Sequence, residues 1–134
     1  MCGIFGIISS SNFINSDLFE LASHSQQRGS DSSGLYIGTD HGYSIYRSNQ
    51  PLSSLLKQTV IPQSGLIMGH SRLITNGLDD NQPIYRDQIC AIHNGIIVNC
   101  DTLWVDTHKV RHQTIDTEII PAIASEFLEQ GGHI

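Results

Sequence analysis

The chain has 134 residues, with seven Lys plus Arg against thirteen Asp plus Glu and a net charge of -6. This length fits one domain, and 39% hydrophobic residues can supply its core. The acidic balance argues against a nucleic-acid partner or an anionic membrane surface, because both need clustered positive charge. The apolar runs are too short to span a membrane, no secretory signal is recognisable, and three cysteines do not suggest a disulfide framework. We therefore expect one cytoplasmic, reduced domain.

The first half of the chain predicts strands and helices in alternation. Residues 2–8 are apolar on both faces, which predicts a buried central strand at the N-terminus. A helix over residues 17–27 follows, with Asp17 and Glu20 in a capping-box spacing. The next expected elements are a strand at 34–38, a turn at 40–42, its partner strand at 43–47, a short helix over 51–58 and a strand at 66–70.

The second half predicts a loop, a turn and a long helix. Residues 76–83 are rich in Gly, Asp and Asn, which predicts a loop. A strand at 89–93 enters a turn at Asn94-Gly95, and the apolar residues 96–98 leave that turn. Apolar residues between 119 and 128 form a helical stripe that ends before two glycines, and Pro121 within it either kinks the helix or marks its first turn. This mixture predicts an α+β or layered α/β fold.

Cys2 is the first candidate for chemistry. If Met1 is removed, Cys2 carries both a thiol and a free α-amine, whose pKa of about 7.7–8.0 allows it to act as a base near neutral pH. N-terminal nucleophiles use this arrangement. The alternative is a buried structural cysteine, since free cysteine is commonly buried.

Asn94-Gly95 is the second candidate. The Asn side-chain NH₂ and the Gly main-chain N–H could point two hydrogen-bond donors at one oxyanion. The alternative is that the pair simply forms a type I′ hairpin turn.

Six short motifs occur in order along almost the whole chain. They are Met1-Cys2-Gly3-Ile4-Phe5-Gly6-Ile7, Gln27-Arg28-Gly29-Ser30-Asp31-Ser32-Ser33-Gly34, Gly69-His70-Ser71-Arg72-Leu73-Ile74-Thr75, Asn81-Gln82-Pro83-Ile84, His93-Asn94-Gly95-Ile96-Ile97-Val98-Asn99 and Asp116-Thr117-Glu118. Together the motifs resemble the glutaminase domain of the class II glutamine amidotransferases, an N-terminal-nucleophile family. The resemblance implies that the chain hydrolyses L-glutamine to glutamate and ammonia.

The resemblance implies a catalytic role for three residues. Cys2 would attack the glutamine carboxamide and form a thioester, with its own α-amine moving the proton. Asn94 and the Gly95 N–H would hold the tetrahedral oxyanion. The ammonia would pass to an acceptor in a synthase domain or subunit, and no metal or organic cofactor is implied.

Four further residues are assigned to the site by the same resemblance. Arg72 would bind the α-carboxylate of glutamine and Asp116 its α-ammonium, with helix capping as a possible second duty of Asp116. Thr75 would line the pocket, and Arg28 would orient the loop near the nucleophile. A zwitterionic substrate requires one cation and one anion in its site, and this pair would supply them.

The resemblance also implies the architecture. We expect a four-layer αββα sandwich of the N-terminal-nucleophile hydrolase type, in which two antiparallel sheets pack between helices. Residues 1–134 would be the N-terminal part of the glutaminase domain, incomplete at the C-terminus, with the remaining strands and any synthase domain absent. The isolated chain would then be marginally stable.

Three alternatives remain open. The chain could be a catalytically silent glutamine-binding or interaction module, although every expected site residue is present. It could be an N-terminal-nucleophile hydrolase of another amide, although the Arg72 and Asp116 pair favours an amino-acid substrate. A zinc set could be drawn from Cys90, His93, Cys100, His108 and His112. However, the first two would point to opposite faces of a strand, so we expect no metal site and exposed positions for His108 and His112.

Overall fold

The structure is a computed structural model that describes residues 2–12, 15–73 and 81–133. The described residues form an α+β fold with antiparallel strands. The elements in chain order are β1 (Gly3–Ser9), α1 (Asn15–Gln26), β2 (Ser32–Thr39), β3 (Gly42–Ser48), α2 (Leu52–Gln58), β4 (Gly65–Arg72), β5 (Ile84–Arg86), β6 (Ile89–Ala91), α3 (Cys100–Asp106), the 3-10 turn η1 (Asp116–Glu118) and α4 (Ile119–Glu129). Within these ranges, no helix is long and apolar enough to cross a membrane.

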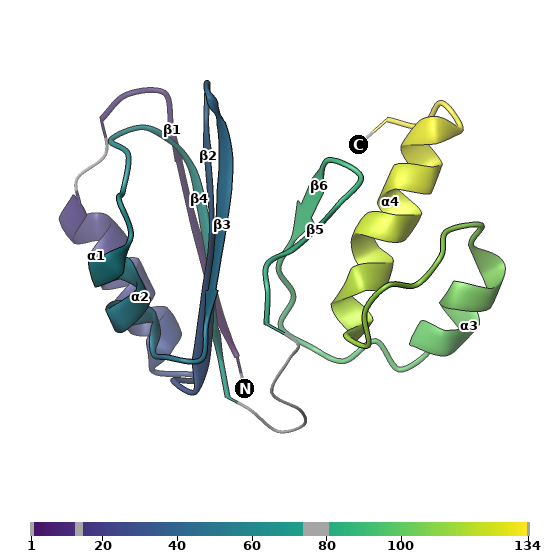
Figure 1. The fold of residues 1–134 in the computed structure, drawn as a ribbon, viewed down its shortest axis with the longest axis horizontal. Coiled ribbons are helices and arrows are strands. Elements are labelled where there is room, and N and C mark those ends of the chain that lie inside the picture. The colour runs from purple at the N-terminus through teal and green to yellow at the C-terminus, as the bar shows by residue number, and fades with distance from the viewer. Residues whose placement is uncertain (1, 13–14, 74–80, 134) are drawn as a thin grey trace.

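The first sheet has the strand order β1-β4-β2-β3, and α1 and α2 cover one of its faces (Figure 1). Side chains alternate along each strand, so every second residue points toward these helices. Phe5, Leu35 and Ile67 do so and pack with Leu18 and Leu52 in one buried cluster. This cluster is the main core, and it explains why the period-two and helical patterns of the first half predict the elements correctly.

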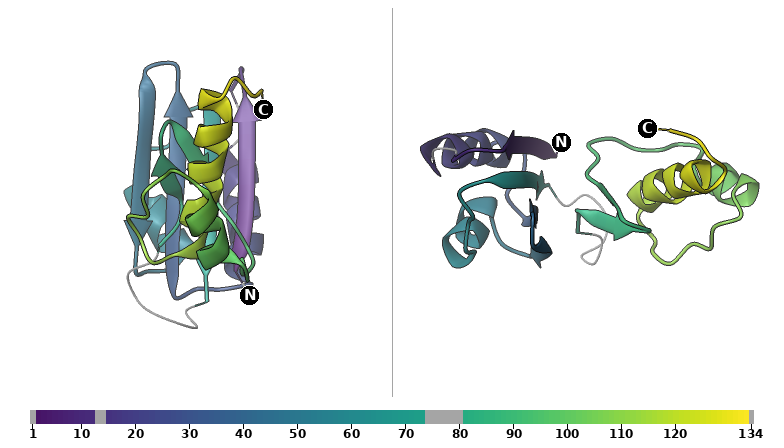
Figure 2. Two further views of the ribbon diagram at one scale, coloured as in Figure 1. Left: turned by 90° about the vertical axis from the view of Figure 1, so that its right-hand side faces the viewer. Right: turned by 90° about the horizontal axis from the view of Figure 1, so that it is seen from above.

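The hairpin of β5 and β6 lies against the other face of the sheet, and α4 packs on the far side of the hairpin, running nearly along the strand direction (Figures 1 and 2). The layers are therefore helices, sheet, hairpin and helix. The guanidinium of Arg47 on β3 donates to the main-chain oxygen of Pro83 at 2.9 Å from Nε. The rings of Tyr43 on β3 and Tyr85 on β5 stack with their centroids 4.4 Å apart. The hairpin thus contacts the sheet over its β3 side.

The first strand differs from its prediction as a buried central strand. Within the described residues β1 pairs with β4 alone and forms an edge of the sheet. Phe5 faces the helices and is 8% exposed, but Ile4 and Ile8 point the other way and are 48% and 79% exposed. The apolar pattern correctly predicts a strand. It cannot say how many neighbours the strand has.

The segment around Asn94-Gly95 is also different from its prediction. The strand expected at 89–93 is confined to Ile89–Ala91, and it pairs with β5 through a two-residue turn at Asp87 and Gln88, which have φ angles of 49° and 66°. Residues 96–98 form no strand and lead instead into α3, which was not expected. The His93 N–H and C=O groups are bonded to a side chain, as described below, so they cannot join a strand ladder.

The remaining elements are confirmed with small shifts in their bounds. The helix expected at 17–27 spans Asn15–Gln26, and the hairpin expected around residues 40–42 joins β2 and β3. Pro121 is buried and lies in the first turn of α4, directly after η1, so it marks the start of this helix and does not kink it. Most of the loop expected at 76–83 lies outside the described residues.

Candidate active site

One pocket of about 310 Å³ collects residues from five segments of the chain. Its size lies at the lower end of the range of about 300–1,000 Å³ for small-molecule sites. The pocket is lined by Cys2, His70, Arg72, Leu73, Gln82, His93, Gly95, Ile96, Thr114, Ile115 and Asp116. The structure therefore brings together four of the seven residues assigned to the site, namely Cys2, Arg72, Gly95 and Asp116.

Strand pairing places the thiol beside the cation. Gly3 on β1 is opposite Ser71 on β4 in the antiparallel register. Cys2 directly precedes Gly3 and Arg72 directly follows Ser71, so the two residues meet at the same end of the sheet. The position of Arg72 next to Cys2 is thus fixed by the main chain of the sheet.

The main chain at Cys2 is held from the side of α1. The Arg28 Nε donates a hydrogen bond to the Cys2 main-chain oxygen at 3.2 Å. A Cβ at position 3 would lie 2.1 Å from the main-chain oxygen of Ser25, so glycine is required for this approach. Arg28 thus contacts Cys2 from outside the pocket lining, and its supporting role stays a prediction.

Asp116 supplies an anion to the pocket and also bonds to the loop after β6. Its Oδ2 accepts a hydrogen bond from the Ile97 N–H at 2.7 Å. The expected helix-capping duty is wrong, because η1 has Ile115 at its N-cap and no side-chain capping bond. The carboxylate of Asp116 instead bridges η1 to the segment that carries Gly95.

The glycine at position 95 is required by its neighbour. A Cβ there would lie 2.7 Å from Nε2 of His93, so any side chain would displace the imidazole ring from the pocket wall. Asn94 is exposed and does not line the pocket in this structure, so its contribution to the oxyanion site stays a prediction. Thr75 lies outside the described residues.

Among the lining residues that have no role assigned from the sequence, His70 and Gln82 are the buried polar ones. Both lie within the quoted motifs, which is the signal that could have drawn attention to them. His70 is 1% exposed. Its burial, with Arg72 and His93 nearby, lowers the pKa of its imidazole from the usual 6.5 to about 4. His70 is therefore neutral at pH 7.

The zinc alternative finds no support in this geometry. Across residues 2–12, 15–73 and 81–133, no group of three or more His, Cys, Asp or Glu side chains is placed to hold a metal ion. The side chains of His108 and His112 are 92% and 66% exposed, as expected for surface histidines. Burial raises the pKa of the Cys90 thiol to about 11, so this cysteine is protonated at neutral pH.

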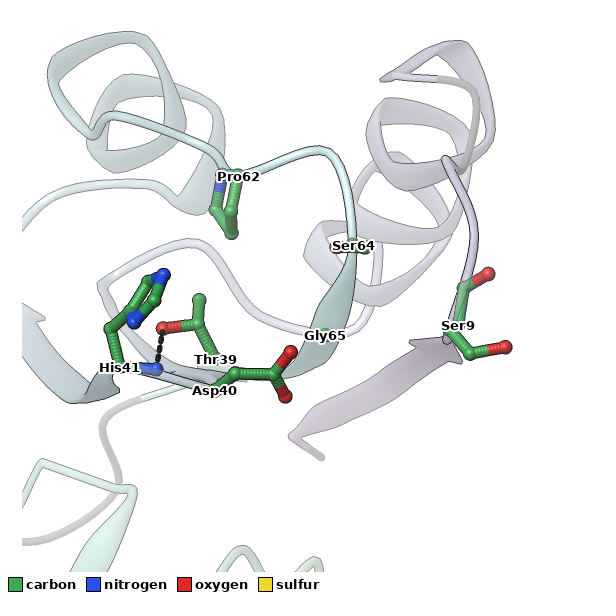
Figure 3. Close-up of a pocket in the computed structure, with 8 residues that line it drawn as sticks. Ser9, Thr39, Asp40, His41, Pro62, Ser64 and Gly65 are labelled. Atoms are coloured by element: carbon green, nitrogen blue, oxygen red, sulfur yellow. Dashed lines mark hydrogen bonds between the residues drawn. The ribbon is translucent and has the colours of Figure 1, made fainter.

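A second pocket, of about 330 Å³, lies at the opposite end of the first sheet (Figure 3). Ser9, Thr39, Asp40, His41 and Gly65 are among its lining residues, and the Thr39 hydroxyl accepts a hydrogen bond from the His41 N–H at 3.3 Å. The seven residues of β1 separate it from Cys2, a distance of roughly 20 Å. None of the described residues assigned to the site lines this second pocket.

Comparison with known proteins supplies the relatives of the chain. No protein-family profile matches it. The glutamine–fructose-6-phosphate aminotransferase (isomerizing) of Sulfolobus acidocaldarius is 32% identical and aligns with 98% of this chain and 24% of its own length. The proteins of that name from Helicobacter pylori and Streptococcus pyogenes are 29% and 28% identical, over 100% and 97% of this chain. The N-terminal domain of such enzymes is a class II glutamine amidotransferase.

The chain is related to the class II glutamine amidotransferases. The resemblance expected from its motifs is thereby confirmed. The chain spans about a quarter of the length of these curated relatives, which are amidotransferases of several hundred residues.

Proposed function

We propose that the chain is a glutaminase domain, in which Cys2 attacks the side-chain amide of L-glutamine. The convergence of Cys2, Arg72, Gly95 and Asp116 on one pocket carries the proposal. The four residues lie just before β1, at the end of β4, in η1 and in the loop after β6, so the fold brings together groups that are far apart in the sequence.

The proposed reaction proceeds in two halves. The Cys2 sulfur bonds to the carboxamide carbon while the thiol proton moves to the α-amine of the same residue. The Gly95 N–H, with the Asn94 amide, stabilises the oxyanion of the tetrahedral intermediate. The C–N bond then breaks, ammonia leaves with that proton, and a thioester remains. Water attacks the thioester, which releases glutamate and restores the thiol.

Substrate selection rests on the two charges of the pocket. The Arg72 guanidinium presents parallel donors that match a carboxylate, and the Asp116 carboxylate offers acceptors to an ammonium group. Free glutamine carries both groups at its amino-acid end. A simple amide carries neither, so it would gain nothing from either residue.

The proposal extends to the architecture and to the partner. The order of helices, sheet, hairpin and helix supports an αββα sandwich, of which residues 1–134 would form the N-terminal part. The relatives are about four times longer, and their name gives fructose 6-phosphate together with glutamine. We therefore assign the ammonia acceptor to a synthase domain or subunit outside these residues.

The test is covalent labelling combined with an ammonia-release assay on the full chain. A diazo-ketone analogue of glutamine should modify Cys2 in a protein that lacks Met1 by intact mass, and L-glutamine should protect the thiol. Cys90→Ala and Cys100→Ala serve as matched controls and should label normally. Ammonia release that survives Cys2→Ala would overturn the proposal. Glutamine binding without ammonia release would identify a silent module, and preference for an N-acyl substrate would identify a different hydrolase.

A further inference from the structure

The Gln82 side chain makes three hydrogen bonds beneath the pocket. It is 6% exposed and lies in the segment that enters β5. Its Nε2 donates to the His93 main-chain oxygen at 3.0 Å and to the Thr117 hydroxyl at 3.0 Å. Its Oε1 accepts from the His93 N–H at 2.5 Å. Both hydrogen-bonding groups of the His93 main chain are therefore satisfied by one amide.

Side-chain hydrogen bonds anchor both ends of the loop that carries Asn94 and Gly95. Gln82 holds the first end of this loop at His93, and Asp116 holds its other end through the Ile97 N–H at 2.7 Å. The Thr117 hydroxyl joins the two anchors, because it accepts from Gln82 and lies 3.4 Å from Oδ1 of Asp116 as a donor. The loop and the carboxylate of the pocket are thus tied to a common network.

We propose that Gln82 is the positioning residue of the oxyanion site. Resting on the proposed glutaminase function, the inference is that this one amide sets where the Gly95 N–H stands relative to the thiol of Cys2 and to Asp116. Gln82 acts through the main chain of His93. It touches the pocket wall but performs no step of the reaction.

The chemistry of the side chain explains why an amide is needed. A donor and an acceptor must sit at one end of the side chain to bond the C=O and N–H of a single residue. A carboxylate would keep the acceptor but place a second oxygen opposite the His93 and Thr117 oxygens. A thioether of the same length would offer neither bond. Either change frees the loop at His93.

A displaced oxyanion donor affects the transition state more than the bound substrate. We therefore expect Gln82→Glu and Gln82→Met to lower kcat roughly 10- to 100-fold, somewhat less than removal of an oxyanion donor itself. The dissociation constant for L-glutamine should change less than about threefold, because Arg72 keeps its place in the β-sheet. The Met variant adds no charge, so it separates loss of the clamp from electrostatic repulsion of the substrate.

The experiment measures kcat, glutamine binding by calorimetry, and amide hydrogen exchange on the full chain of both variants. Gln58→Glu, in α2 and exposed, is the matched control and should behave as the unmodified chain. Exchange at the His93 N–H, which donates to Gln82, should accelerate about tenfold or more in the Gln82 variants while exchange in β2 and β4 is unchanged. That exchange measurement needs no activity, so it decides the inference even if the unmodified chain releases no ammonia. Unchanged exchange, or equal losses in binding and kcat, would overturn it.

Discussion

The exchange of Asp116 for Asn isolates the charge of the pocket from its architecture. Asp116 accepts from the Ile97 N–H through one oxygen, and its carboxylate lines the pocket. An amide can turn its remaining oxygen to Ile97, so the Asp116→Asn variant keeps the loop anchored. It loses the negative charge that would face the α-ammonium of glutamine.

The size of the effect follows from the position of the residue. Asp116 is half-buried in an open pocket, so solvent weakens its interaction with a bound cation. Hydrogen bonds to charged groups contribute about 1.5–3 kcal/mol, and a value of about 2 kcal/mol suits this setting. The Asp116→Asn variant should therefore lower kcat/KM for L-glutamine about 30-fold, because each 1.36 kcal/mol is a factor of ten.

The assay compares two substrates on two proteins. Glutaramate has the same carboxamide and a carboxylate but no α-ammonium, so the unmodified chain should already use it poorly. With glutaramate, the Asp116→Asn variant should lose less than about threefold in kcat/KM, because this substrate has no α-ammonium group for Asp116 to bind. Asp106→Asn, exposed at the end of α3, is the matched control. An equal loss with both substrates would show that Asp116 acts through the loop alone and would refute the reasoning.

Three further predictions concern stability. Glu118 is 1% exposed and accepts hydrogen bonds from the Arg86 guanidinium at 2.8 Å and from the Gln113 N–H at 2.7 Å. The Glu118→Gln variant should therefore lose about 3 kcal/mol of stability, and its urea midpoint should fall by about 1.5 M. The control Glu129→Gln changes a side chain that is 65% exposed and should leave the midpoint nearly unchanged. Gly34→Ala would place a Cβ 1.8 Å from the Gln82 main-chain oxygen, so it should lower stability by about 1–3 kcal/mol and also lower turnover. The control Gly6→Ala, whose Cβ would have its nearest contact at 3.6 Å, should be tolerated. Equal urea midpoints for the two variants would contradict this prediction. The pKa of His70 is lowered to about 4 in the folded chain, so the unfolded chain takes up a proton first as pH falls below 6.5. Up to about 3 kcal/mol of stability is therefore present above pH 6.5 and is lost by pH 4. A His70→Asn variant that shows the same dependence of the urea midpoint on pH would disprove this prediction.

The first half of the fold could be predicted because its patterns are local. Alternating apolar residues in β2 and the turn before Gly42 report directly on the hairpin they form. Around Asn94 the main chain bonds to the side chains of Gln82 and Asp116, which are 11 and 19 positions away from His93 and Ile97. Such partners leave no trace in local periodicity. The helix α3 was missed for a different reason. Cys100, Leu103 and Trp104 have helical spacing and pack in one cluster, but the seven residues of α3 are too few for this periodicity to stand out in the sequence.

The order of the motifs predicts a candidate site, and the structure adds what the motifs leave out. Cys2, Arg72, Gly95 and Asp116 are brought to one pocket, but the sequence could not show that His70 and Gln82 complete its wall. Both were embedded among stronger signals, and neither carries a charge at neutral pH. Their significance comes from burial and from bonds across the chain, which only the folded arrangement provides.

The edge position of β1 places Cys2, the proposed nucleophile, next to one of the two edge strands of the first sheet. Within the described residues β1 pairs with β4 along one side, and Ile4 and Ile8 on its other face are largely exposed, so they gain little free energy from burial. Opening β1 breaks one ladder of hydrogen bonds and removes Phe5 from the core, whereas opening β2 breaks two ladders and removes both Leu35 and Ile37. Local fraying of β1 would carry Cys2 away from Arg72 while the rest of the molecule stays folded. Labelling of Cys2 by the diazo-ketone analogue of glutamine should consequently decrease at denaturant concentrations that leave the far-ultraviolet circular dichroism spectrum unchanged. Loss of labelling then reports a local opening that precedes global unfolding.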